Sequence, residues 1–379
     1  MKRARLEMQA NRIEAVLASH KIPAQVCGGR VSPRYVRFHL ATAAGVRLAR
    51  IANLSEEIAL ALDARTCRVR RENGTLAVEV PLETERTVAF ANVLRKVQRI
   101  PPCTALLGVD EGGHPLLIRL PSPEVAHILI AGTTGCGKTM LMQAMILSLA
   151  LANRRSALQM ALIDPKMRGF GALAGVPHLL SGVIHAPEEA AALLERLVAE
   201  MIRRDHERRS DPRVVVFIDE LADLAQAESG RRCASLLTRL AQRGREAGIH
   251  LVVGTQKPSS EISGAMFKSN FPVRLVGRVT SADDARVAAG VGGSGAEKLL
   301  GRGDFLAVAC GSVVHFQAPL LRPPELRHLL GHVQAGGQWP PLPPGAGSGA
   351  AAAGLPPRAG GPGAPPMRRQ AAGESPWRD

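Results

Sequence analysis

The sequence is poor in aromatic side chains and has no closely paired cysteines. Phe, Trp and Tyr make up 3% of its 379 residues, with only one Tyr and two Trp. Proteins that hold single strands by stacking bases need more aromatic platforms, so that class of binding is excluded. None of the six cysteines forms a CxxC pair. This excludes a paired-thiolate zinc site and a disulfide framework, and it indicates reduced thiols.

Long apolar runs are also missing. The basic start (Met1-Lys-Arg-Ala-Arg5) is typical of a signal peptide, but polar and charged residues then interrupt any apolar stretch. The longest apolar run, residues 140–152, contains Gln143 and Ser148 and is too short to cross a bilayer. The sequence therefore predicts a cytoplasmic protein with no integral membrane segment.

Basic residues outnumber acidic ones. Lys and Arg total 48 and Asp and Glu total 33, which gives a formal net charge of +15. Such an excess indicates a polyanionic partner, either nucleic acid or an acidic membrane surface. With so few aromatics, contacts to a phosphate backbone are favoured. The 46% of hydrophobic residues excludes a wholly disordered chain.

Three domains are predicted from the order of these patterns. Residues 1–104 form a small α+β domain with a helix near residues 5–20, an alternating strand at 35–40 and a hairpin turning at Asn73-Gly74. It contains no pair of acid and base residues and no spacing typical of metal ligands, so we interpret it as a scaffold or interface domain.

In residues 334–379, Pro, Gly and Ala make up 30 of 46 residues, which predicts a disordered tail. The tail could be a passive linker or a docking segment.

Residues 105–333 alternate short apolar runs with helical stretches. The runs lie at 127–131, 158–163, 214–218, 251–253 and 273–276. They are typical of an α/β domain whose parallel sheet is buried on both faces by helices. Ligands bind at the carboxyl ends of such strands, so the residues that follow each run are the candidates for a functional site. A further hairpin is predicted over 305–310 and 313–316.

A phosphate-binding loop follows the first run. The pattern GxxxxGK[ST] stands between a strand and a helix, the context that it requires. Its glycines let backbone N–H groups wrap phosphates, and the helix N-terminus adds positive charge. The loop is predicted to bind ATP, with Lys138 reaching the β- and γ-phosphates and Thr139 binding Mg²⁺. Its residues are Gly132, Thr133, Thr134, Gly135, Cys136, Gly137, Lys138 and Thr139. Cys136, at a helix N-terminus, is predicted to have a lowered pKa and a reactive thiol.

Two carboxylates follow the run at 214–218. Asp219 fits a residue that binds Mg²⁺ directly or through one of the ligands of the ion, and Glu220 is placed to act as a general base on the attacking water. An acid after a strand can also be a solvated strand end, but the phosphate loop upstream favours the catalytic interpretation.

Other polar residues remain open from the sequence alone. Gln256 follows the run at 251–253 and could sense the γ-phosphate or simply hold a loop. Asp164 and Lys166 follow the run at 158–163, and a structural ion pair is one interpretation. Arginines 243 and 245 could serve a neighbouring subunit or could be solvated helix-end charges. Four scattered histidines are predicted to be structural: His178, His185, His250 and His315.

The ordered motifs resemble the FtsK/SpoIIIE family of DNA translocases. The matching stretches are "HILIAGTTGCGKT", "LIDPK", "VPHLL", "VVFIDELADL", "LAQRGREAGIHLVVGTQKPS", "FPVRL" and "GAEKLLGRGDFL". Upstream, "AAGVRLARIANLSEEIALAL", "VEVP" and "LGVDEGGHPLLIRL" resemble the non-catalytic ring domain of that family.

The resemblance implies a RecA-like P-loop NTPase preceded by a small α+β domain. It implies an ATP- and Mg²⁺-dependent motor that assembles as a hexameric ring around double-stranded DNA and serves chromosome or plasmid segregation or transfer. In the family, the residue matching Gln256 senses nucleotide and the one matching Arg245 acts as an arginine finger in trans. This chain shows neither N-terminal membrane helices nor a C-terminal winged helix, and residues 204–214 form a shortened segment.

Two other functions are compatible with these motifs. One is the motor of a protein-secretion system, although such motors typically carry tandem motor domains and this chain has one phosphate loop. The other is a DNA-binding scaffold that holds ATP without hydrolysing it, against which the intact Lys138, Asp219 and Glu220 argue.

Overall fold

The computed structural model describes residues 3–32, 35–43, 45–64, 66–72, 75–82, 87–226, 229–256, 270–337 and 377–378. The chain divides into two compact units. The first comprises residues 1–87, 111–113 and 358–379, and the second comprises residues 88–110 and 114–357. The sequence places a domain boundary between residues 104 and 105, whereas here helix α4 (Phe90–Lys96) already belongs to the second unit.

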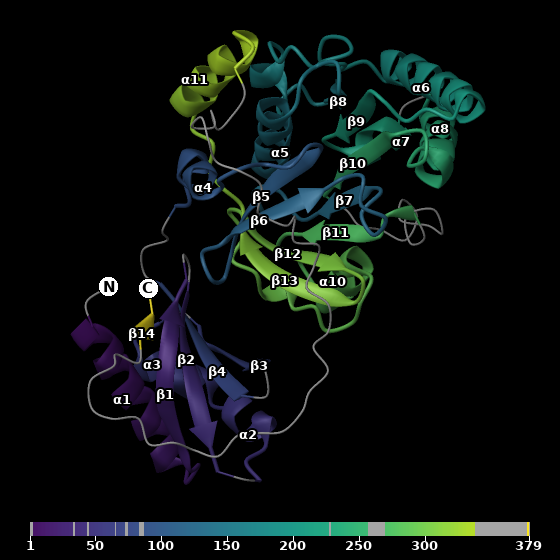
Figure 1. The fold of residues 1–379 in the computed structure, drawn as a ribbon. Helices are drawn as coiled ribbons and strands as arrows, with labels where there is room; N and C mark the ends of the chain where they lie inside the picture. Colours follow the sequence, from purple (N-terminus) through teal and green to yellow (C-terminus); the bar gives the residue numbers. More distant parts are fainter. Residues whose placement is uncertain are drawn as a thin grey trace. The chain divides into compact units, whose positions relative to one another are not determined.

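The first unit is a mostly antiparallel sheet with helices against it (Figure 1). Val36, Phe38 and Leu40 of the predicted strand pack with Ile13 and Leu17 of the first helix. The sheet order is β14-β1-β2-β4-β3, and only the β14–β1 pair is parallel. Its elements are α1 (Arg3–Ser19), β1 (Ala24–Val31), β2 (Tyr35–Thr42), α2 (Leu48–Ala52), α3 (Ser55–Ala61), β3 (Arg68–Glu72), β4 (Thr75–Pro81) and β14 (Trp377–Arg378).

Two sequence predictions fall partly outside the described residues. In the first unit, strands β3 and β4 pair as the predicted hairpin, with Glu72 opposite Thr75, while the turn residues Asn73 and Gly74 are not described. In the second unit, helix α11 (Pro323–Gln334) precedes the predicted tail, and the structure describes the chain to Gly337. Of the remaining tail only Trp377 and Arg378 are described, so its predicted disorder stays a prediction.

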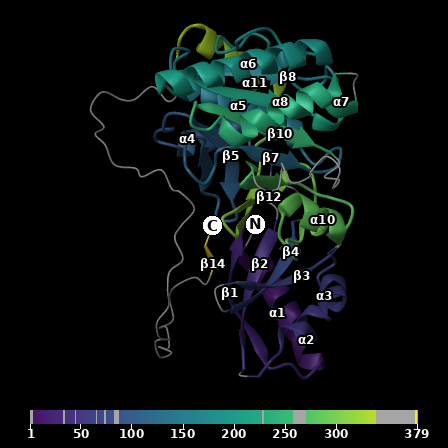
Figure 2. The ribbon, with the colours of Figure 1, turned by 90° about the vertical axis from the view of Figure 1, so that its right-hand side faces the viewer.

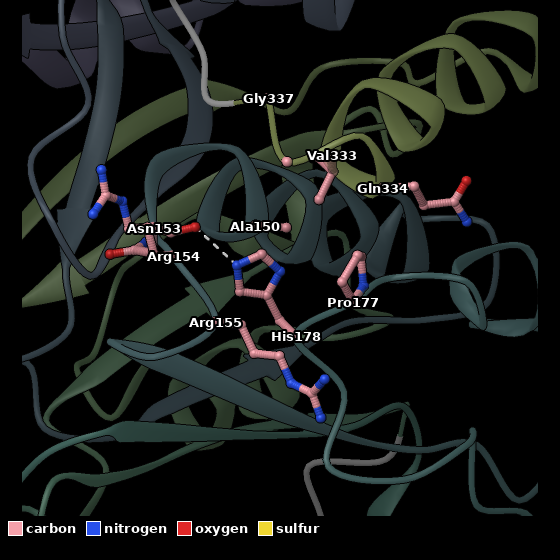
Figure 3. Close-up of a pocket in the computed structure, with 10 residues that line it drawn as sticks. Ala150, Asn153, Arg154, Arg155, Pro177, His178, Val333, Gln334 and Gly337 are labelled. Carbon is pink, nitrogen blue, oxygen red and sulfur yellow. Dashed lines mark hydrogen bonds between the residues drawn. The ribbon is translucent and has the colours of Figure 1, made fainter.

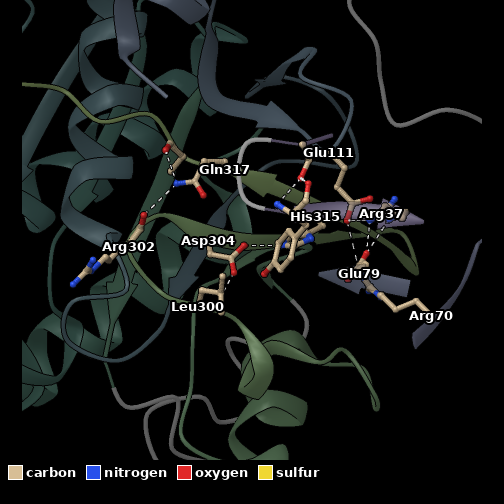
Figure 4. A network of polar contacts seen from close by, with 12 residues as sticks. Arg37, Arg70, Glu79, Glu111, Leu300, Arg302, Asp304, His315 and Gln317 are labelled. Carbon is tan, nitrogen blue, oxygen red and sulfur yellow. Dashed lines mark hydrogen bonds and ion pairs between the residues drawn. The ribbon is translucent and has the colours of Figure 1, made fainter. Parts of the chain in front are cut away.

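An ion cluster lies in the same unit. The Arg37 guanidinium contacts the carboxylates of Glu79 and Glu111, each at 2.5 Å. Arg70 lies 3.8 Å from Glu79 and 3.7 Å from Glu111. Glu79 is 1% exposed, so its carboxylate is paired with these guanidinium groups rather than hydrated. Figure 4 shows the four side chains converging.

The second unit contains a nine-stranded sheet. The sheet order is β6-β5-β13-β12-β11-β7-β10-β9-β8. Its strands are β5 (Thr104–Asp110), β6 (Pro115–Arg119), β7 (Ile128–Ala131), β8 (Leu158–Ile163), β9 (Arg213–Ile218), β10 (Ile249–Thr255), β11 (Val273–Val276), β12 (Asp304–Ala309) and β13 (Ser312–Gln317). The helical elements, with α4, are α5 (Lys138–Ala152), η1 (Gly171–Leu173), α6 (Pro187–Glu207), α7 (Leu221–Gln226), α8 (Gly230–Arg243), α10 (Ala282–Ala289), η2 (Ala296–Lys298) and α11 (Pro323–Gln334).

The sheet is mixed rather than wholly parallel. The five predicted apolar runs became β7, β8, β9, β10 and β11, which pair in parallel. The predicted hairpin became β12 and β13, which continue the same sheet in antiparallel sense. Strands β5 and β6 extend it further. The prediction of a parallel sheet therefore holds for the five strands that precede the candidate site residues.

Helices cover both faces of this sheet (Figures 1 and 2). Alternate residues of each strand point to opposite faces, so Ile128 and Ile130 pack with α4, α5 and α11, while Leu129 packs with α6, α7 and α8. Helix α5 is apolar all round, and its side chains from Leu141 to Leu151 are buried. The result is a helix–sheet–helix sandwich, in which strand ends are the accessible places on the sheet.

Candidate active site

The phosphate loop joins β7 to α5. Gly137 caps the helix in the left-handed region, with φ of 105°. A Cβ atom at this position would lie 2.7 Å from the Gly303 nitrogen. Glycine is therefore required here both by the backbone angle and by the close neighbour. The first turn of α5 then presents Lys138 and Thr139.

Asp219 follows β9 and reaches the start of α5. The Thr139 hydroxyl donates a hydrogen bond of 3.1 Å to Asp219 Oδ1. Asp219 is 6% exposed, and burial raises the pKa of its carboxyl, an effect that Lys138 partly offsets. A hydroxyl and a carboxylate side by side are oxygen donors of the kind that Mg²⁺ prefers. These two residues would hold the ion.

Glu220 pairs with the loop lysine. The Lys138 Nζ atom lies 3.0 Å from Glu220 Oε2, with the side chains 6% and 2% exposed. The Gln256 backbone N–H lies 3.2 Å from both carboxylate oxygens. Glu220 is thus held by a cation and an amide in a site from which water is largely excluded.

Gln256 lies at the carboxyl end of β10, the strand between β7 and β9. Its side-chain Oε1 accepts a hydrogen bond of 2.7 Å from the Thr134 hydroxyl. The phosphate loop, Asp219, Glu220 and Gln256 are therefore brought together at one edge of the sheet. Residues 257–269, which follow Gln256, lie outside the described part.

Arg245 does not join this group within the chain. It is exposed in the turn between α8 and β10, before the strand whose far end carries Gln256. Strand β10 has seven residues, which at about 3.3 Å each separates its two ends by about 20 Å. Arg243 instead forms a surface ion pair of 2.7 Å with Asp205.

The residues after β8, Asp164 and Lys166, have hydrogen-bond and ion-pair partners that the sequence did not identify. Asp164 is fully buried, and its Oδ2 accepts hydrogen bonds from Gly169 N–H at 2.7 Å and Phe170 N–H at 2.9 Å. Lys166 pairs with Asp223 at 3.1 Å rather than with Asp164. Asp164 therefore folds the loop 164–170 back, and a Cβ at Gly169 would lie 3.2 Å from the Asp219 carboxylate.

The prediction of a reactive Cys136 was wrong. The side chain is 2% exposed and packs near Gly132 and Gly277. Burial raises the pKa of its thiol, outweighing the favourable effect of Lys138 and the neighbouring N–H groups. The helix N-terminus lowers a thiol pKa only where the thiolate stays solvated or paired.

A separate hollow of about 340 Å³ lies at the other end of α5 (Figure 3). Its walls include Asn153, which caps that helix, and the buried His178, whose Nε2 lies 2.8 Å from the Asn153 carbonyl oxygen. Because α5 separates this hollow from the phosphate loop, it is not part of the nucleotide site. Within the described residues no cluster of three or more potential metal ligands occurs, and no helix is long and apolar enough to span a membrane.

Two solved structures have a fold similar to that of this chain. The chain resembles the conjugation coupling protein TcpA of pCW3, in its monomer form with ATPγS, with a TM-score of 0.57 and 17% identity over 85% of this chain and 99% of that one. It also resembles the cytoplasmic domain of the type VII secretion ATPase EccC of Thermomonospora curvata, with a TM-score of 0.55 and 22% identity over 65% of this chain and 35% of that one.

Sequence relatives are more similar. The DNA translocase FtsK of Staphylococcus aureus is 33% identical over 365 residues, covering 87% of this chain and 45% of that protein. The DNA translocase FtsK of Sporosarcina ureae is 33% identical over 339 residues, covering 81% and 43%. The chain thus spans a little under half the length of these relatives. The FtsK/SpoIIIE family pattern matches residues 94–210 and 201–260, and that of the FtsK alpha domain matches residues 1–82. The chain, with its RecA-like second unit, belongs to the FtsK/SpoIIIE family of P-loop ATPases.

Proposed function

We propose that the chain couples the hydrolysis of Mg²⁺-ATP to movement along double-stranded DNA, as a subunit of a hexameric ring. The observation that carries this proposal is the group formed by the buried Lys138, Asp219 and Glu220 with the partly buried Thr139 at the carboxyl edge of the sheet. A protein that only stored ATP would need the first three residues but no buried general base. We expect the protein to work in the cytoplasm, where both ATP and DNA would be available to it.

Each side chain has a role in this proposal. Lys138 would bind the β- and γ-phosphates, and Thr139 and Asp219 would hold Mg²⁺, which neutralises the charge on the phosphate oxygens. A bound triphosphate competes with Glu220 for the Lys138 ammonium, because the two side chains are already in contact. Once Lys138 turns to the phosphates, the Glu220 carboxylate is free to accept a proton from the attacking water.

Gln256 would report the state of the nucleotide. Its backbone N–H holds Glu220 and its side chain holds Thr134 of the phosphate loop. A change at either contact therefore shifts the end of β10.

Arg245 would act on a neighbouring subunit. Its side chain is exposed and lies at the opposite end of β10 from the nucleotide site of its own chain. This separation favours action on a neighbouring site in a ring over action in cis.

The DNA partner is proposed from charge and family. The net charge of +15 and the small number of aromatic side chains favour contacts to the phosphates of a duplex over the stacking of separated bases. The names of the sequence relatives, DNA translocase FtsK, support the same partner.

The decisive experiment measures the ATPase rate with linear duplex DNA, with a short single strand and with neither, over a series of salt concentrations. Duplex DNA is expected to stimulate hydrolysis, and its affinity should fall with log salt by a slope of about 0.9 for each phosphate contacted. Glu220→Gln is the inactive control. Stimulation only by a polypeptide would instead support a protein-secretion motor, and no hydrolysis under any condition would support a scaffold that merely binds ATP.

A further inference from the structure

A second loop lies directly against the phosphate loop. This brace loop, Leu300–Gly303, connects η2 to β12. The Gly303 N–H donates a hydrogen bond of 2.6 Å to the Cys136 carbonyl, and the Arg302 N–H donates one of 3.2 Å to the Gly135 carbonyl. Two consecutive carbonyl groups of the phosphate loop are therefore held from outside it.

These bonds fix the direction of an N–H group on the other side of the loop. In a trans peptide the C=O of one residue and the N–H of the next lie in one plane and point in opposite directions. Holding the Cys136 carbonyl toward Gly303 therefore turns the Gly137 N–H away from the brace loop. That N–H makes no hydrogen bond within the described part of the chain. It belongs to the row of amides that bind phosphate in this motif.

The brace loop has a strained backbone. Gly301, Arg302 and Gly303 all have positive φ, at 77°, 49° and 91°. Such a run is unfavourable for Arg302 and persists only where its surroundings impose it. The surroundings here are supplied by β12 and β13.

Asp304 and His315 supply that constraint (Figure 4). Asp304 Oδ2 accepts a hydrogen bond of 2.7 Å from the Leu300 N–H, and its Oδ1 lies 2.5 Å from His315 Nε2. The two residues are 1% and 8% exposed. From β13, Gln317 Nε2 also donates to the Arg302 carbonyl at 3.1 Å.

We propose that Asp304 and His315 are positioning residues for the nucleotide site. Asp304 closes the brace loop and His315 orients Asp304, so that the loop holds the phosphate-loop carbonyls and aims the Gly137 N–H at the bound phosphates. They act through the backbone and touch no part of the nucleotide. This role is independent of what the motor moves, because it concerns the binding of nucleotide alone.

Asp304→Ala is the principal test, with a fluorescent ADP analogue as the probe. Removing the carboxylate leaves the partly buried Leu300 N–H without this acceptor, which corresponds to a loss of about 5- to 100-fold in affinity if the brace loop relaxes. Asp304→Asn is the conservative variant. Its amide oxygen still accepts from Leu300, and its NH₂ group can donate to the other tautomer of His315. Asp304→Asn is therefore expected to recover most of the affinity.

A matched control separates positioning from general loss of stability. His178→Ala removes another buried histidine of the same unit, far from the phosphate loop. It should lower the melting temperature without changing ADP affinity. An Asp304→Ala protein that binds ADP within twofold of wild type overturns the proposal, as does an equal loss of affinity in His178→Ala or in Asp304→Asn.

A second variant keeps the test valid if Asp304→Ala does not fold. Gln317→Leu removes the hydrogen bonds of Nε2 to the Arg302 and Ala318 carbonyls from a partly buried side chain, and it should weaken ADP binding severalfold. Unchanged affinity in this variant counts against the proposal. If the wild-type chain itself bound no ADP analogue, the ATPase assignment would fail instead, and that result is distinguishable from all of these.

Discussion

The contact between Lys138 and Glu220 makes a prediction about the protein without nucleotide. In Glu220→Gln, the Lys138 ammonium loses its buried counter-charge. Removing one partner of a buried ion pair costs about 3–5 kcal/mol, because the other charge stays uncompensated. Glutamine keeps the size of glutamate and one carbonyl acceptor, so we expect the lower value of about 3 kcal/mol.

This loss should appear as a lower melting temperature of the second unit. At about 2–4 °C per kcal/mol for a domain of this size, the expected decrease is about 6–12 °C in calorimetry without nucleotide. ATP supplies a new anion for Lys138 and no longer competes with Glu220. We therefore expect Glu220→Gln to bind ATP about 10- to 100-fold more tightly than wild type, and ATP to restore most of the lost stability.

Glu79→Gln is the matched control for this prediction. It also neutralises a buried carboxylate paired with a cation, here Arg37 in the first unit. It should destabilise the first unit and leave ATP affinity unchanged. A Glu220→Gln protein with the melting temperature and ATP affinity of wild type would refute the reasoning that Glu220 supplies the buried counter-charge of Lys138.

Three more predictions concern single residues. Because burial raises the pKa of the Cys136 thiol, iodoacetamide should label the exposed Cys310 well before Cys136 at pH 8, and peptide mass spectrometry showing the reverse order would contradict this. Burial likewise raises the pKa of Asp219, so its ionisation lowers stability at neutral pH but not below the unfolded pKa of about 4. Asp219→Asn should therefore raise the melting temperature at pH 7 and leave it unchanged at pH 4, while abolishing Mg²⁺-dependent hydrolysis. Arg245→Ala should reduce hydrolysis by about 10³-fold, and mixing it with Glu220→Gln should restore part of the rate in mixed rings. No recovery, once labelled subunits show that exchange occurs, would remove Arg245 from the site.

Much of the second unit could be predicted from local sequence. Strands β8, β9, β10 and β11 are buried on both faces, so each leaves an almost unbroken apolar run that is visible without any knowledge of its neighbours. Polar residues directly after such runs then share one edge of the sheet. For this reason Asp219 and Gln256 could be placed beside the phosphate loop before the structure was known.

Features set by distant residues could not be predicted in this way. The sequence shows an aspartate at position 164 after a strand, but not that its partners are the N–H groups of Gly169 and Phe170. The sequence around His315 has no spacing of residues typical of a metal site or a catalytic site, and only the pairing of β12 with β13 brings His315 to Asp304. The Cys136 prediction failed for the same reason, because a local rule on helix ends was outweighed by burial among segments far along the chain.

The strand order has a consequence for synthesis on the ribosome. Val109 and Asp110 of β5 pair with Gln317 and Phe316 of β13, and about 200 residues separate the two strands. At a synthesis rate of about 5–20 residues per second, β13 is synthesised on the order of 10–40 s after β5. The Cys136 carbonyl likewise has no Gly303 N–H until that residue has emerged. A nascent chain therefore exposes unpaired strand edges, which favour aggregation, and it cannot use nucleotide binding for stability until nearly the whole second unit has been made.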